Sequence, residues 1–225
     1  MLARQGQHVQ VNIYGRDVYV RKGTPDLLAA MSCFSGEFKD LRGKLPQAFD
    51  GVIVDAGGYI GTSAIAMRNL YPNAKLVVIE PSRENITVLR KNLAGFDNIE
   101  IVYGALVGKS IGTITLKNRG TGEWGFTAVH NPEDVSEATQ LHETPAFTLS
   151  EVVEDIDTIG ILKLDIEGGE ADILRHDAAT LKRIPLVFAE LHDRIVEGCS
   201  DLFFDFSKDR EVEQFGGEKF LSVRK

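Results

Sequence analysis

The most informative stretch of the sequence is Asp55-Ala56-Gly57-Gly58-Tyr59-Ile60-Gly61, which directly follows the apolar run Val52-Ile53-Val54. The apolar run predicts a buried strand, and the segment 62–70 after the glycines has the pattern of a helix. A glycine-rich turn between a buried strand and a helix is where α/β sheets hold ligands. Gly57 allows a tight turn close to a ligand, Gly61 lets the helix pack near the strand, and the free amides at the helix start can bind a carboxylate.

The segments that follow this turn extend the same pattern. From residue 51 onward, short apolar runs alternate with amphipathic segments, which predicts parallel strands covered by crossover helices. We expect strands at 75–79, 98–103, 161–165 and 186–190, and helices that begin at Ser82 and near Glu170. The alternation lapses between 108 and 148, which predicts an inserted hairpin and loop, and the tail 211–223 predicts a closing antiparallel pair of strands. The fold class is therefore α/β, with a mostly parallel, doubly wound, Rossmann-like sheet.

The first fifty residues have a different pattern from the rest of the chain. Short β-like runs at 9–13 and 18–21 are followed by a turn at 23–25 and by a helix that begins at Asp26. The carboxylate of Asp26 is expected to cap this helix. We predict that residues 1–50 form an amino-terminal lid or extension and that residues 51–225 form the catalytic domain.

The composition limits the class of protein. The chain has 225 residues, of which 43% are hydrophobic, so it can bury one substantial core. Its apolar runs fall far short of the roughly 20 residues that a membrane helix needs, and its amino terminus lacks a signal-peptide pattern. Cys33 and Cys199 are far apart and outside any CxxC motif, which indicates reduced thiols and a cytoplasmic protein. The net charge of −8 and the scattered basic residues argue against a nucleic-acid partner.

The glycine turn departs from the fingerprint of a dinucleotide site. Gly57 and Gly61 are four residues apart and an acidic residue, Asp55, precedes them, whereas a dinucleotide fold favours G-x-G-x-x-G. The charge of Asp55 would repel a pyrophosphate but attract the ammonium and sulfonium groups of S-adenosylmethionine. Glu80 follows the next strand, where its carboxylate can accept hydrogen bonds from a ribose. S-adenosylmethionine is therefore the expected cofactor, and its expected contacts also include Gly58, Tyr59, Pro81, Gly104 and Ala105.

A second motif, Lys163-Leu164-Asp165-Ile166-Glu167-Gly168-Gly169-Glu170, ends the fourth main strand. Together with the turn 55–61, Glu80-Pro81 and Glu190-Leu191-His192, it resembles the FkbM family of S-adenosylmethionine-dependent methyltransferases. The resemblance implies O-methylation of a hydroxyl on a sugar or natural product, so the expected partner is a small-molecule or glycan acceptor. It also implies donor contacts from Asp55, Gly57 and Gly61, a ribose contact from Glu80, and a reaction centre lined by Asp165 and Glu167.

The motifs also contain candidates for the proton acceptor. Methyl transfer from a sulfonium depends mainly on alignment, but an alcohol that is methylated must still lose its proton. His192 is the first candidate base, and Glu190 is expected to lie on the same side and orient its imidazole. Asp165 and Glu167 are alternative bases. These four side chains can in principle also hold a metal ion, but their spacing does not require one, and none is assigned.

Several alternatives stay open on the sequence. A nicotinamide-dependent oxidoreductase also combines a strand, a glycine turn, a helix and a downstream acid, and a non-catalytic nucleotide-binding domain can keep the same fold. Nitrogen acceptors also stay possible, although the chain has nothing like the Asn/Asp-Pro-Pro-Tyr/Phe signature of amino-group methylation. The sequence does not indicate an oligomeric state.

Overall fold

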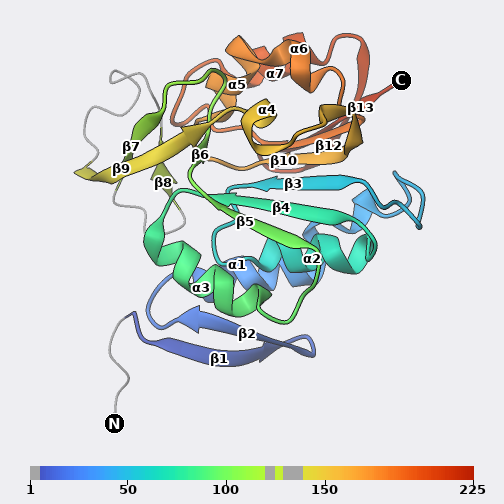
Figure 1. Ribbon diagram of the computed structural model, residues 1–225. Helices are drawn as coiled ribbons and strands as arrows, with labels where there is room; N and C mark the ends of the chain where they lie inside the picture. Colours follow the sequence, from blue (N-terminus) through green and yellow to red (C-terminus); the bar gives the residue numbers. More distant parts are fainter. Residues whose placement is uncertain (1–5, 120–124, 129–138) are drawn as a thin grey trace.

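The computed structural model describes residues 6–119, 125–128 and 139–225. Five parallel strands form its centre, namely β3 (Val52–Ala56), β4 (Lys75–Glu80), β5 (Ile99–Tyr103), β10 (Ile159–Leu164) and β11 (Leu186–Glu190). Two antiparallel strands, β12 (Arg210–Gly216) and β13 (Lys219–Arg224), extend the sheet beside β11. The order is β12-β13-β11-β10-β3-β4-β5 (Figure 1). The predicted α/β sheet and its closing antiparallel strands are confirmed.

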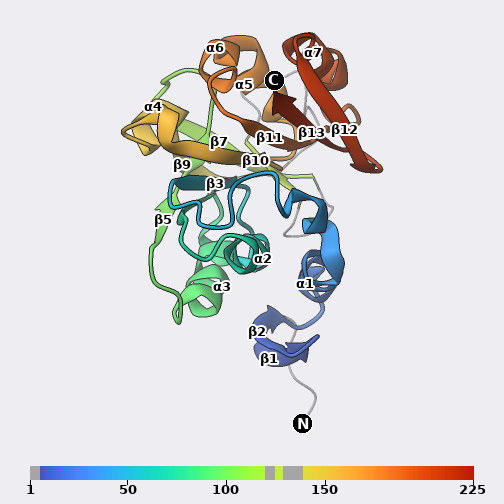
Figure 2. The same ribbon diagram turned by 90° about the vertical axis from the view of Figure 1, so that its right-hand side faces the viewer.

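Helices cover both faces of this sheet (Figure 2). One face carries α1 (Asp26–Ser32), α2 (Thr62–Leu70) and α3 (Arg83–Leu93). The other carries α4 (Leu149–Val152), α5 (Glu170–His176), α6 (Ala178–Leu181) and α7 (Cys199–Phe206). Because successive side chains of a strand point to opposite faces, Ile53 packs in one hydrophobic core and its neighbour Val54 in the other. Both faces of the strands are therefore buried, as the continuous apolar runs indicated.

Helix α1 begins at Asp26 as predicted, and the predicted cap of α3 is confirmed, but the predicted cap of α1 is not. The side chain of Ser82 accepts a hydrogen bond from the amide of Asn85 and caps α3. Asp26, in contrast, makes no cap hydrogen bond, because its carboxylate is engaged by the guanidinium and the backbone amide of Arg21 at 2.7 to 2.9 Å. The prediction that Asp26 caps its helix is therefore wrong: a buried ion pair outcompetes the helix amides for the carboxylate.

The amino-terminal segment packs on the helical face formed by α1, α2 and α3. A hairpin of β1 (His8–Ile13) and β2 (Arg16–Arg21) lies against α3, and Val18 and Val20 join the same core as Ile53 of the central sheet. After α1 the chain continues as a π-helix (Cys33–Glu37) and a short 3₁₀ helix (Lys39–Leu41). Residues 1–50 thus share a core with the sheet, and their separation as a distinct lid stays a prediction.

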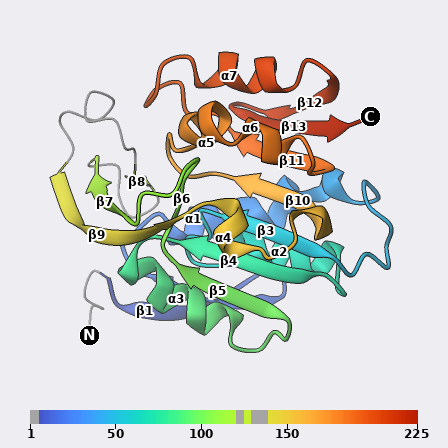
Figure 3. The ribbon, with the colours of Figure 1, turned by 45° about the horizontal axis from the view of Figure 1, so that its top comes forward.

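The inserted segment forms a second, smaller sheet. Its strands are β6 (Ala105–Leu106), β7 (Thr113–Asn118), β8 (Phe126–Thr127) and β9 (Thr139–Phe147), in the order β6-β9-β7-β8 (Figure 3). β7 pairs antiparallel with β9, which confirms the expected insertion of a paired extra strand. Most of the predicted loop lies outside the described residues. Within the described ranges, no helix is long and apolar enough to cross a membrane.

Candidate functional site

A cavity of about 680 Å³ opens at the carboxyl ends of the parallel strands, which is where α/β sheets bind ligands. A volume of this order accommodates a nucleoside-sized ligand. Nine of the residues predicted from sequence line it: Gly57, Tyr59, Glu80, Pro81, Gly104, Ala105, Asp165, Glu167 and Glu190. The other predicted residues, Asp55, Gly58, Gly61 and His192, lie behind this lining. The structure therefore brings the two sequence motifs together around a single space.

The glycine turn is packed so closely that side chains would not fit. Gly57 has φ +80, and a Cβ added there would lie 1.8 Å from the carbonyl oxygen of Asp165. A Cβ at Gly58 would lie 2.3 Å from a methyl group of Val78. The amides of both glycines donate to the carbonyl of Ile79 at 3.0 Å, so they are not free to bind a cofactor. The first amides of α2, which precede the bond from Ile65 to Gly61, have no acceptor within the helix and remain as donors.

Glu80 is a buried carboxylate held by the chain around it. Only 4% of its surface is exposed, and its oxygens accept hydrogen bonds from the amides of Tyr59 and Ser82, both at 2.9 Å, and from the side chain of Asn85 at 3.0 Å. Burial raises the pKa of Glu80 to about 7, despite these donors. The carboxylate borders the cavity in a fixed orientation. It can therefore accept hydrogen bonds from the hydroxyl groups of a ligand.

Asp55 is fully buried and forms an ion pair instead of facing the cavity. Its carboxylate lies 3.0 Å from Nζ of Lys163 and accepts a hydrogen bond from Ser63 at 2.5 Å. Lys163 stands opposite Asp55 in the parallel register of β10 and β3, lies 3.5 Å from Asp165 and donates to the carbonyl of Gly57. The charge of Asp55 is therefore balanced by Lys163, and the expected direct attraction of a cationic donor by Asp55 is not what this geometry provides.

Four acidic or basic side chains meet at the cavity wall beyond the ends of β10 and β11. Asp165, Glu167 and Glu190 face the cavity, and His192 lies just behind them, fully buried. Nε2 of His192 is 3.9 Å from Asp165 and 3.7 Å from Glu167. We refer to these four residues as the acid end and to Gly57, Tyr59, Glu80 and Gly104 as the glycine end.

The imidazole of His192 is oriented by a residue that the sequence analysis did not select. Its Nδ1 lies 3.0 Å from Glu170, and Glu170 also accepts hydrogen bonds from the amides of Ile166 and Gly168. Glu190, the predicted partner, instead lies 3.6 Å from Lys219. The expectation that Glu190 orients His192 is therefore wrong. Glu170 stands in the second motif, but only the tertiary fold shows that it turns back toward β11.

Burial and neighbouring charges shift the pKa values at the acid end. Burial alone would lower the pKa of His192, but Glu170, Asp165 and Glu167 together raise it to about 9. Burial raises the pKa of Glu167, and burial together with Asp165 raises that of Glu190. The carboxylates of Glu170, Asp165 and Glu167 therefore favour the protonated form of the imidazole, which does not suit a general base.

Basic side chains that sequence reasoning missed surround the acid end. Arg119 and Arg194 lie 3.0 and 3.3 Å from Glu167, and Lys219 pairs with both Glu190 and Glu37. These residues come from the insertion, from the segment after β11 and from β13, so no local sequence motif predicts that they lie together. Glu167 itself has φ +51, an unusual backbone conformation for a non-glycine residue that often marks functional sites.

The profile of the methyltransferase FkbM domain matches residues 55–217, which is more than half of the chain. The chain belongs to the FkbM methyltransferase family. This membership confirms the resemblance, the class I methyltransferase fold and S-adenosylmethionine as the methyl donor of the family. It does not favour an oxidoreductase.

Solved structures of methyltransferases are similar to this FkbM-family chain in fold. The FkbM methyltransferase of Methylobacillus flagellatus KT is 15% identical with a TM-score of 0.53, and the match covers 80% of this chain and 44% of that one. A 16S rRNA methyltransferase of T. thermophilus, solved with AdoMet and guanosine, is 12% identical with a TM-score of 0.50, over 100% and 52% of the two chains. This chain thus spans about half the length of each. No curated protein matches it.

Proposed function

We propose that this chain binds S-adenosylmethionine at the glycine end of the cavity and transfers its methyl group to a hydroxyl oxygen of a sugar or natural product. The observation that carries the proposal is that six predicted donor residues, namely Gly57, Tyr59, Glu80, Pro81, Gly104 and Ala105, line the same cavity as the predicted reaction-centre carboxylates. A donor seated among the first group would present its methyl group toward the second.

The donor's nucleoside fits the glycine end. Glu80 holds a carboxylate at the cavity wall, already fixed by three N–H donors, so that its remaining lone pairs can accept the two ribose hydroxyls. Pro81, Gly104 and Ala105 line the cavity together with Glu80, and we place the adenine ring against them. The free amides at the start of α2 point positive charge at the donor's carboxylate.

The donor's cationic sulfonium fits the acid end. Glu167 places a carboxylate on the cavity wall, and it attracts the ammonium and sulfonium charges that Asp55 was expected to attract. Asp55 keeps an indirect role in this proposal, because it holds Lys163, which contacts both Asp165 and the carbonyl of Gly57.

The reaction is an in-line displacement. The acceptor oxygen attacks the methyl carbon, the carbon–sulfur bond breaks, and S-adenosylhomocysteine leaves with the electron pair of that bond. The proton of the hydroxyl passes to a carboxylate of the acid end, and Glu167 is our first choice because it borders the cavity while His192 does not. Most of the acceleration comes from alignment of oxygen, carbon and sulfur.

The mouth of the cavity favours an acceptor with an apolar portion. Leu28 of α1 lines the cavity, yet 62% of its surface is exposed, and its neighbours Leu27 and Met31 are also exposed. Exposed apolar side chains grouped beside a cavity are typical of binding sites for ligands with an apolar part. A glycosylated or polyketide-like molecule has both an apolar part that can contact these side chains and a hydroxyl that can be methylated. The negative net charge disfavours a nucleic acid.

A labelled-methyl assay tests the proposal. The full chain is incubated with methyl-labelled S-adenosylmethionine and matched panels of sugars, glycosylated natural products, amines and RNA. We expect label in at least one hydroxyl-bearing acceptor, and loss of that activity in Glu167→Gln. Transfer only to amines would overturn the oxygen assignment, and transfer only to RNA would overturn the acceptor class.

A further inference from the structure

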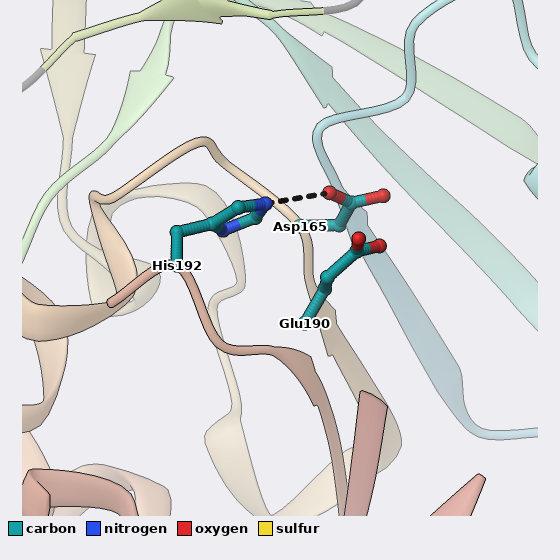
Figure 4. A group of neighbouring side chains, drawn as sticks. All are labelled: Asp165, Glu190 and His192. Carbon is teal, nitrogen blue, oxygen red and sulfur yellow. Dashed lines mark ion pairs between the residues drawn. The ribbon is translucent and has the colours of Figure 1, made fainter. Parts of the chain in front are cut away.

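Asp165, Glu190 and His192 form a convergent group at the inner wall of the cavity (Figure 4). Asp165 directly follows β10, Glu190 ends the adjacent parallel strand β11, and His192 comes two residues later. One ligand-type atom from each lies within 4.8 Å of the others. Neighbouring strand ends thus bring together three donors that are distant in sequence.

The imidazole of His192 supplies a second, independent observation. The side chain is 0% exposed, and its Nε2 has no hydrogen-bond partner among the described residues. Figure 4 shows that Nε2 is directed at Asp165, which lies 3.9 Å away, and Glu167 lies 3.7 Å away, so both carboxylates are beyond hydrogen-bond distance. A buried polar atom without a partner is costly and calls for an explanation.

The contact with Glu170 defines which nitrogen can accept. An ionised carboxylate only accepts hydrogen bonds, so Nδ1 of His192, at 3.0 Å from Glu170, carries the donated proton. A metal ion that displaces the remaining proton of the imidazole to solvent then meets the lone pair of Nε2, which points into the group. A carboxylate that fixes the tautomer and the direction of an imidazole in this way is the usual neighbour of a metal-binding histidine.

The nearby cations balance the acidic charge only in part. Lys163 lies near Asp165 but is shared with Asp55, and Lys219 lies near Glu190 but is shared with Glu37. Arg119 and Arg194 contact Glu167 instead. The carboxylates of Asp165 and Glu190 are therefore only partly neutralised, and a further cation beside them would be stabilised.

We propose that Asp165, Glu190 and His192 bind one divalent cation of the Mg²⁺ or Mn²⁺ class. Two carboxylates suit a hard cation, and one imidazole is compatible with Mn²⁺ in particular. Ligands about 2.1 Å from an octahedral ion lie about 3 to 4.2 Å from one another, so the present spacing closes with small side-chain movements. The remaining coordination positions face the cavity. If the proposed methyl transfer is correct, they receive the acceptor's hydroxyl oxygen and leave Glu167 to take its proton.

The binding test uses the full chain, freed of metal with a chelator and without methyl donor. Mn²⁺ is titrated, and the free ion is followed by electron paramagnetic resonance, while electron spin-echo modulation detects a nitrogen ligand. We expect one Mn²⁺ per chain, a nitrogen coupling from the imidazole, and displacement by excess Mg²⁺. No bound Mn²⁺, or bound Mn²⁺ without the nitrogen coupling, would overturn the site, and the wild-type measurement alone decides this.

Matched variants locate the ion. Glu190→Gln keeps the shape of a direct ligand and should weaken Mn²⁺ binding at least tenfold, and Glu170→Gln, which acts through the imidazole, should weaken it roughly 10- to 100-fold. Glu211→Gln makes the same charge change on the exposed strand β12 and should leave binding unaltered. Equal affinities in all three would overturn the proposal. Donor binding is measured separately with S-adenosylhomocysteine, so failure of one site does not imply failure of the other.

Discussion

The two ends of the cavity are built on different principles. At the glycine end, the polar groups are already paired within the chain: the amides of Gly57 and Gly58 bond to Ile79, and Glu80 accepts three N–H donors. At the acid end, Nε2 of His192 has no hydrogen-bond partner among the described residues, and Glu190 shares its lysine with Glu37. The glycine end is a preformed surface that a ligand completes, whereas the acid end holds charge that still needs a ligand.

Gly57 connects the two ends, and its replacement should have the largest effect. In Gly57→Ala the new methyl group would strike the carbonyl of Asp165, since 1.8 Å separates their ideal positions, and the backbone has φ +80. We expect a loss of more than about 3 kcal/mol in the free energy of unfolding, measured by denaturant titration, and loss of S-adenosylhomocysteine binding.

Gly112→Ala is the matched control for this change. Gly112 has φ +78 but no atom within 4 Å of an added Cβ, so the variant carries the same backbone strain without the collision. Its expected cost is only about 1 to 2 kcal/mol. Equal destabilisation of the two variants would mean that the close contact of Gly57 with the carbonyl of Asp165 does not limit the side chain at this position.

Breaking the buried ion pair behind the cavity should cause the next largest loss in the free energy of unfolding. Asp55→Asn leaves Lys163 buried with only the more distant Asp165 as a charged partner, and we expect a loss of about 3 kcal/mol. Glu100→Gln breaks the pair of Glu100 with Lys75, whose side chains are 47% and 45% exposed, and should cost less than about 1 kcal/mol. Chemical denaturation compares the two, and similar losses would contradict a structural role for Asp55.

Glu80 permits a test that is specific to the glycine end. 5′-Methylthioadenosine carries the nucleoside of the donor but no amino-acid group, so its binding reports on the nucleoside contacts without those of the amino acid. Glu80→Gln should weaken this binding roughly 10- to 100-fold, as expected for hydrogen bonds to a charged group. Isothermal titration calorimetry measures the affinities. Unchanged affinity would remove Glu80 from the site.

The affinity for 5′-methylthioadenosine should also fall as the pH is lowered. The pKa of Glu80 is about 7, so the carboxylate is ionised above that pH and gains a proton below it, which removes acceptor capacity. From about pH 8 to about pH 6, wild-type affinity should fall by up to roughly tenfold. The groups that contact Glu80, namely the amides of Tyr59 and Ser82 and the side chain of Asn85, do not titrate in this range. A flat profile in the wild type, or an equal slope in Glu80→Gln, would contradict this assignment.

The smallest expected effect concerns the cap beside Glu80. Ser82→Ala removes the side-chain cap of α3 and should cost about 1 kcal/mol of stability. Because the amide of Ser82, and not its hydroxyl, holds Glu80, nucleoside binding should stay within about twofold of the wild type. Thermal unfolding and calorimetry check the two parts separately, and a large loss of affinity would show that the hydroxyl contributes to the site.

The contrast between the two ends also explains what the sequence could predict. The glycine end consists of residues that directly follow apolar strands, so strand, turn and helix patterns located Gly57, Glu80 and Gly104 without knowledge of the fold. The acid end depends on contacts across β10 and β11. The sequence selected its four members, but it paired His192 with Glu190, whereas the backward turn at 166–170 places Glu170 against the ring. The same limit hid the pair of Asp55 and Lys163, which only the strand register brings together.

The central claim is that the glycine end supplies the main contacts of the donor, so that loss of the Glu80 carboxylate should weaken donor binding far more than loss of the Glu190 carboxylate. Calorimetry with S-adenosylhomocysteine on metal-free protein tests it most directly, with Glu80→Gln and Glu190→Gln beside the wild type. We predict one bound molecule per chain in the wild type, similar affinity in Glu190→Gln, and binding at least roughly tenfold weaker in Glu80→Gln. A well-folded wild-type chain that gives no binding heat at several temperatures, or a loss of affinity confined to Glu190→Gln, would contradict the account.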